Sequence, residues 1–153
     1  MKQGNEFLQK RCQKFTYDNA VDGDITTNTS FVLGTLPKGA LIIGGAIHIV
    51  TDVTDADAGD DTTIAFGYTG ATTAFWAATA VSVLETGKLL TILPGQAALG
   101  ADAAHDTAAE VAELVDASWL LMSTDVQVLA TVSNDVAINA GKFNVFIEYY
   151  VSV

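Results

Sequence analysis

The chain has 153 residues, half of them apolar and 16% charged, so it is long enough for one domain with a continuous core and too apolar for a disordered chain. Its 18 acidic and 7 basic residues give a formal net charge of −11, and the body of the chain lacks the clustered positive charge that binds nucleic acid or an anionic membrane. No apolar run is long enough to span a bilayer and no secretory signal is visible, so we expect neither nucleic-acid nor membrane partners.

Most of the basic charge lies in the first 14 residues. They contain one acid, Glu6, and four basic residues: Lys2, Lys10, Arg11 and Lys14. Residues 15–153 contain the other 3 of the 7 basic residues and the other 17 of the 18 acidic residues. We therefore divide the chain into a basic N-terminal arm, residues 1–14, and a single β-sandwich domain, residues 15–153. The arm is predicted to contact a partner, and a frayed, solvated terminus is the alternative.

Short segments rich in Val, Ile, Thr, Phe and Tyr follow one another along the domain, separated by turn residues. The predicted strands are residues 13–19, 30–36, 40–53, 62–69, 74–84, 88–93, 119–123, 126–133 and 142–152. Two packed antiparallel sheets are the economical way to bury so many amphipathic strands. The sequence therefore predicts an all-β fold, an antiparallel β-sandwich of the jelly-roll type.

Turn residues connect these segments. A polar turn is expected at Asp22-Gly23-Asp24, and a type I turn at Leu36-Pro37-Lys38-Gly39, which has Pro second and Gly fourth. Asn139-Ala140-Gly141 predicts a hairpin turn before the last strand. The Gly44-Gly45 pair predicts a bulge or a bend inside the third strand.

An Ala-rich, acidic stretch, residues 94–118, interrupts the series of strands. Thr107 and Glu110 have the spacing of a capping box, and apolar residues follow at helical spacing. We expect a short helical or loop insertion around residues 100–117, at one end of the sandwich.

No sequence motif for catalysis is found. His48 lies between Ile47 and Ile49 on a predicted strand and is expected to be packed or solvent-facing, and His105 lacks partners for a metal site. Cys12 has basic neighbours but no general base, and as the single cysteine it excludes an internal disulfide. We expect no enzymatic activity and no cofactor.

The acidic loop, residues 52–61, offers one metal hypothesis. Its carboxylates could converge on Ca²⁺, which takes oxygen ligands: Asp55, Asp57, Asp60 and Asp61. Gly59 and the missing closing Glu depart from the EF-hand pattern, so a solvated turn is favoured and no metal is predicted.

Two tryptophans, Trp76 and Trp119, are candidates for stacking on a sugar ring, as in β-sandwich lectins. Each lies in an apolar strand, which favours packing in the core or at a subunit interface.

Four segments of the chain resemble a group of small tailed-bacteriophage structural proteins that includes capsid decoration (cement) proteins. They are Tyr17–Gly23, Leu36–Ile42, Thr63–Tyr68 and Ala140–Tyr149. The resemblance covers most of residues 15–153 and rests on turn and strand signatures. It implies a jelly-roll subunit, commonly trimeric, seated on an assembled head at the junctions between major capsid proteins.

The expected function is therefore structural: a capsid decoration subunit that binds and stabilises the assembled phage head. It would lie on the capsid surface of the virion, be assembled in the host cytoplasm, contact the major capsid protein and form a homotrimer. The basic arm would become ordered on docking. A phage tail or neck component and a glycan- or receptor-binding module are the alternatives.

Overall fold

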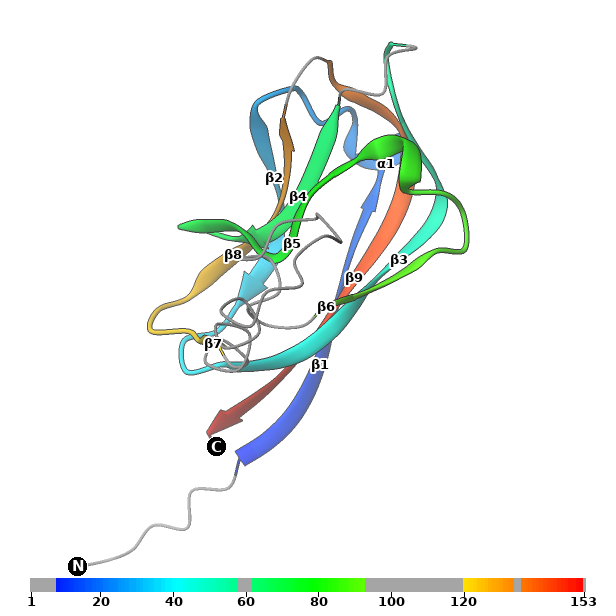
Figure 1. Cartoon of the computed structure of the whole chain (residues 1–153). Helices are drawn as coiled ribbons and strands as arrows, with labels where there is room; N and C mark the ends of the chain where they lie inside the picture. The colour runs from blue at the N-terminus through cyan, green and yellow to red at the C-terminus, as the bar shows by residue number, and fades with distance from the viewer. Residues whose placement is uncertain (1–7, 58–61, 93–119, 134–135, 153) are drawn as a thin grey trace, which may run out of the picture.

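The computed structural model of the protein describes residues 8–57, 62–92, 120–133 and 136–152, and these form two packed antiparallel sheets (Figure 1). Sheet A has the strand order β1 (Leu8–Asp18), β9 (Ile138–Ser152), β3 (Leu41–Asp55) and β6 (Leu89–Ile92), and the short β7 (Leu120–Leu121) also pairs with β3. Sheet B has the order β2 (Thr29–Leu36), β8 (Val126–Ser133), β4 (Thr63–Tyr68) and β5 (Ala71–Ala80).

The chain crosses repeatedly from one sheet to the other. It runs from β1 in sheet A to β2 in sheet B, back to β3, and on to the β4–β5 hairpin in sheet B. It then returns to β6 in sheet A, crosses to β8 and ends on β9. This alternating path is the wrapped order of a jelly roll. The predicted all-β antiparallel sandwich is thus confirmed.

Two short helical segments accompany the described strands. A one-turn helix, α1 (Asn19–Asp22), follows β1 and replaces the last residue of the first predicted strand. A 3₁₀ turn, η1 (Val81–Val83), follows β5, where the sequence predicted continued strand. The helical or loop insertion predicted around residues 100–117 lies outside the described residues.

β1 begins at Leu8, earlier than the predicted Gln13, so the expected boundary at residue 14 falls inside a strand. Residues 8–14 show no buried face of their own, which is why the sequence pattern missed them. Their order comes from a distant partner, since β1 pairs with β9 along its whole length, from Leu8 opposite Ser152 to Asp18 opposite Lys142. The two strands run side by side to one end of the sandwich (Figure 1).

Two of the predicted turns are wrong in detail. Asn139-Ala140-Gly141 is not a hairpin turn but part of β9, where the pairing with β3 shifts register, and Gly141 has φ 123° beside Val53. The turn after β2 spans residues 37–40, because Ala40 N–H donates to the Pro37 carbonyl at 3.1 Å. Gly39 then occupies its third position with φ 81°, as a type II turn requires. The bulge predicted at Gly44-Gly45 is confirmed by a register shift between Ile42 and Gly44.

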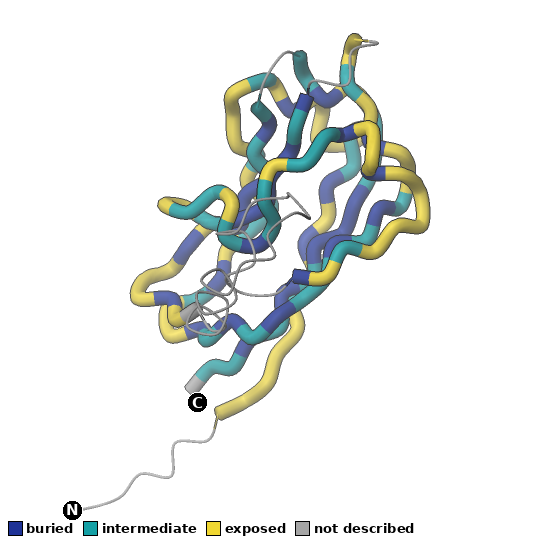
Figure 2. The backbone as a smooth tube through the Cα atoms, viewed as in Figure 1, coloured by how far each residue is buried: buried dark blue, intermediate teal, exposed yellow. Residues whose placement is uncertain are grey.

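The core lies between the sheets, and both sheets contribute buried residues to it (Figure 2). An aromatic cluster joins the two sheets near its centre. Phe143 on β9 stacks on Tyr17 of β1, with ring centroids 5.0 Å apart, and meets Phe66 of β4 edge-on at 5.2 Å. Phe31 of β2 meets Tyr17 edge-on, also at 5.2 Å. Each such pair contributes about 0.5–1.5 kcal/mol beyond the area it buries, so this cluster fixes one sheet on the other.

Candidate functional site

Three of the four basic residues predicted to contact a partner lie on β1, at the edge of sheet A; the fourth, Lys2, lies outside the described residues. Side chains alternate along a strand, so Lys10 and Lys14 share one face and Arg11 lies on the other. All three are exposed. The structure therefore places them on an ordered strand rather than on a free arm.

Each of these three basic residues makes a solvent-exposed contact with a neighbouring side chain. Lys10 Nζ lies 3.0 Å from Glu148 Oε2, and the hydrogen bond to that carboxylate raises the pKa of Lys10. Arg11 Nη2 donates to Gln9 Oε1 at 3.0 Å, and Lys14 Nζ lies 6.0 Å from the centre of the Phe146 ring. Exposed contacts of this kind are worth little, so a partner's carboxylates can replace them.

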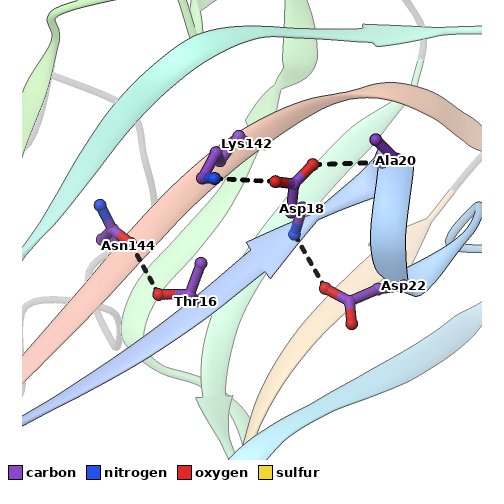
Figure 3. A network of polar contacts seen from close by, with 6 residues as sticks. All are labelled: Thr16, Asp18, Ala20, Asp22, Lys142 and Asn144. Carbon is purple, nitrogen blue, oxygen red and sulfur yellow. Dashed lines mark hydrogen bonds and ion pairs between the residues drawn. The ribbon is translucent and has the colours of Figure 1, made fainter.

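The other end of β1 is anchored by the polar network in Figure 3. Asp18 accepts a hydrogen bond from Lys142 Nζ at 2.7 Å on β9, and it caps α1 by accepting from Ala20 N–H at 3.2 Å. The bond from Lys142 lowers the pKa of Asp18. The Asp18 backbone N–H donates to Asp22 Oδ2 at 2.8 Å. Thr16 Oγ1 donates to Oδ1 of the largely buried Asn144, also at 2.8 Å. β1 is thus fixed at Asp18 and exposed from Leu8 to Cys12.

Charged residues are divided unequally between the sheets. The strands of sheet A carry all the charged residues found in the described strands: Lys10, Arg11, Lys14, Asp18, Asp52, Asp55, Lys142 and Glu148. None of the strands of sheet B, β2, β8, β4 and β5, contains Asp, Glu, Lys or Arg. Sequence reasoning missed this division, although one signal was present: residues 62–84 contain no charged residue.

The residues weighed for chemistry lie apart from one another. His48 is half-buried on β3, on the face opposite the buried Ile47 and Ile49, as predicted, while Cys12 is exposed on β1. Trp76 on β5 is half-buried against the core, and its indole N–H donates to Thr79 Oγ1 at 3.0 Å. Its polar handle is therefore engaged within the chain. His105 and Trp119 lie outside the described residues.

One residue of the acidic loop, Asp52, is held by two hydrogen bonds from Thr86. Asp52 Oδ1 accepts from both the backbone N–H and the hydroxyl of Thr86 at 2.6 Å, which lowers the pKa of Asp52. Asp60 and Asp61 lie outside the described residues. Among the residues that are described, no group of three or more His, Cys, Asp or Glu side chains is placed to hold a metal ion. No described helix is long and apolar enough to cross a membrane.

Comparison with known proteins gives matches in fold alone. No protein-family model and no curated protein matches the chain in sequence. A chain in the cyanophage Pam1 capsid asymmetric unit matches with a TM-score of 0.63 at 20% identity, over 99% of this chain and 90% of that one. A chain in the acid-stable capsid of Helicobacter pylori bacteriophage KHP30 matches with a TM-score of 0.55 at 16% identity, over 95% of this chain and 94% of that one. A chain in the capsid of Ralstonia phage GP4 matches with a TM-score of 0.56 at 15% identity, over 95% of this chain and 85% of that one. This chain shares its fold with a chain in each of these three particles.

Proposed function

We propose that this protein is a structural component of a bacteriophage virion, a decoration subunit that binds and stabilises the assembled head from its outer surface. The observation that carries the proposal is the fold match over at least 95% of this chain to chains from three phage capsids. The resemblance of its strand and turn segments to small tailed-phage structural proteins supports the same function.

The surface suits a protein that acts by adhesion. A net charge of −11 keeps free subunits soluble and apart. The basic residues of β1 form a local exception on this acidic chain, and they are exposed on an anchored strand. We assign to them the contact with the major capsid protein. Weak contacts of this kind, repeated around a homotrimer, add through avidity to firm binding.

No enzymatic step is part of the proposed function. The described histidine, His48, lies on β3 and the described cysteine, Cys12, on β1, and among the described residues no group of three or more His, Cys, Asp or Glu is placed to hold a metal ion. Several polar contacts in the described part of the chain join one strand to another, as the Asp18–Lys142 pair does. Such contacts stiffen a subunit that works by shape and adhesion.

Binding to particles tests this function. Particles are assembled from the genome that encodes the chain with its gene deleted, and the purified protein is added and sedimented with them. Wild-type protein is expected to co-sediment in a saturable and salt-sensitive manner. The double variant Lys10→Gln/Lys14→Gln should bind roughly tenfold more weakly, equivalent to about 1.4 kcal/mol, because charge contacts with the shell are lost.

Lys88→Gln is the matched control, since Lys88 is also an exposed lysine in an ion pair, with Glu85 at 3.2 Å, but lies beside β6. It should bind as the wild type does. Failure of the wild-type protein to bind particles contradicts the proposed function. Equal binding by Lys10→Gln/Lys14→Gln contradicts the role of β1.

A further inference from the structure

The outer face of sheet A can be mapped from the register of its strands. Side chains alternate between the two faces of a strand, and residues paired across neighbouring strands lie on the same face. Tyr17 of β1 is buried in the core, so Lys10 and Lys14 lie on the outer face and Arg11 does not. The residues that pair with these two lysines across the sheet are therefore on the outer face as well.

One row of this outer face is largely apolar. The register places Tyr150 of β9 beside both Lys10 of β1 and Leu41 of β3, and Leu41 in turn lies beside Leu121 of β7. Tyr150 and Leu41 are half-buried, while Leu121 is 67% exposed. Leu8, two residues before Lys10 on the same face, is 64% exposed. Single exposed apolar side chains are ordinary, but a contiguous group of them is typical of a site of protein contact.

The β1 side of this row is positively charged. Lys10 Nζ lies 3.0 Å from Glu148 Oε2, on the same face, and Lys14 Nζ lies 6.0 Å from the centre of the Phe146 ring. Two lysines and one glutamate leave a net positive charge here, on a chain whose net charge is −11. We call this group of residues the end patch: Leu8, Lys10, Lys14, Leu41, Leu121 and Tyr150.

The composition of the end patch determines the chemistry of the surface that complements it. Protein interfaces combine an apolar and aromatic centre with a polar rim. Apolar side chains complement the row that ends at Leu121, and carboxylates complement Lys10 and Lys14. Two copies of this chain meeting through the same patch would instead place two positively charged surfaces against each other, which is unfavourable. The end patch is also continuous with β1, to which the contact with the major capsid protein is assigned.

We propose that the end patch docks, face on, against the major capsid protein, at a surface that presents apolar side chains flanked by carboxylates. The inference rests on the proposed function and narrows it to one face of sheet A. The face of β1 that carries Lys10 and Lys14 lies against the shell, rather than the face that carries Arg11. Leu121, which is far from β1 in the sequence, belongs to the same contact.

The test is the binding of the full chain to particles assembled without it, measured by co-sedimentation. Leu121→Gln should weaken binding about tenfold, because an apolar side chain buried by the shell is replaced by a polar one. Leu89→Gln is the matched control. Leu89 is also a leucine on the outer face of sheet A and is 63% exposed, but it pairs with His48, about 20 Å along β3 from Leu41. It should bind as the wild type does.

A second pair of variants distinguishes the two faces of β1. Lys14→Gln and Arg11→Gln each remove one positive charge from the same strand, on opposite faces. Lys14→Gln should weaken binding about threefold, and Arg11→Gln should weaken it less. An equal or larger loss for Arg11→Gln would show that the strand edge or the net charge determines binding, which overturns the inference and leaves the proposed function standing.

The remaining outcomes separate the inference from the proposed function. Wild-type protein that does not bind particles overturns both. Wild-type binding that Leu121→Gln leaves unchanged, or that Leu89→Gln weakens as much, overturns the inference alone. Self-association of the wild type without particles that is lost in Leu121→Gln would assign the end patch to a second copy and also overturn the inference.

Footprinting of the wild type decides if Leu121→Gln loses its circular dichroism signal. Hydroxyl radicals oxidise exposed side chains, and mass spectrometry locates the oxidised residues. Leu121 and Tyr150 should be protected on particles, while Leu89 should be oxidised to the same extent with and without them. Equal oxidation of Leu121 in free and bound protein overturns the inference.

Discussion

Sheets A and B pack on one core, but their outward chemistry differs. In sheet A the acidic and basic residues pair across strands, as in Lys142–Asp18 and Lys10–Glu148. In sheet B the contacts between side chains are uncharged, as in the 2.8 Å bond between Ser30 and Thr131. A free domain that met only solvent would gain solubility from charges on both sheets. The two sheets therefore present different chemistry to their surroundings.

The comparison of edges leads to the same point. β1 carries three basic residues and is anchored at Asp18, while β5 carries no charge and its pairing with β4 shifts register twice. Charges and register shifts both hinder the pairing of an edge strand with another chain, so the two edges are protected by different means.

The largest predicted effect tests whether the two sheets share one core. Phe143→Ala removes the ring that touches Tyr17 in sheet A and Phe66 in sheet B, and it should lower the free energy of unfolding by about 3–5 kcal/mol. Urea unfolding followed by circular dichroism and by tryptophan fluorescence measures the loss, and the two signals should coincide. Separate transitions would show that the sheets unfold independently, which would contradict the claim that they share one core.

Val32→Ala serves as its control, because Val32 lies on sheet B but is 46% exposed. Its expected effect on the free energy of unfolding is within about 0.5 kcal/mol. If Val32→Ala lowered the free energy of unfolding as much as Phe143→Ala does, the outer face of sheet B would be packed as tightly as the core.

A smaller effect concerns the pH dependence of stability, which should arise in sheet A. The pKa values of Asp18 and Asp52 are lowered in the folded protein, by the hydrogen bond from Lys142 and by those from Thr86. Such groups contribute stability that is fully present above their ordinary pKa of about 3.9, and it is lost as the pH falls through the lowered folded-state value. Unfolding by urea should therefore become easier as the pH falls below about 4.

The variant Asp18→Asn/Asp52→Asn should flatten this acid limb. Asparagine still caps α1 through its side-chain oxygen, so the fold is retained while the titrating groups are removed. The difference in unfolding midpoint between wild type and variant should be greatest near neutral pH and shrink toward about pH 2. A variant with an unaltered pH profile would place the titrating groups elsewhere.

Strand periodicity predicted the sandwich well where one face is buried, and β8 occupies residues 126–133 as expected. Periodicity failed to predict strand residues that are ordered only by pairing with a strand far away in the sequence. Residues 8–14 look like a tail because their pattern is polar, yet β9 supplies a full ladder of backbone partners. Gly141 looks like a turn residue, yet its positive φ serves a bulge opposite Val53.

The basic residues of the candidate contact were visible in the sequence, but their division between two faces of β1 was not, since it requires that residues 10–14 belong to the strand. The absence of charged residues from the strands of sheet B could not be predicted from the sequence for another reason. Its strands, β2, β4, β5 and β8, are scattered along the chain and are brought together only by the jelly-roll path.

The most direct test of the central claim is cryo-electron microscopy of the intact phage particle produced from the genome that encodes this chain. The account predicts density fitting this jelly roll on the outside of the head, in symmetric groups, with β1 toward the major capsid protein. Density found on the tail or neck, or a particle without this chain, would contradict it.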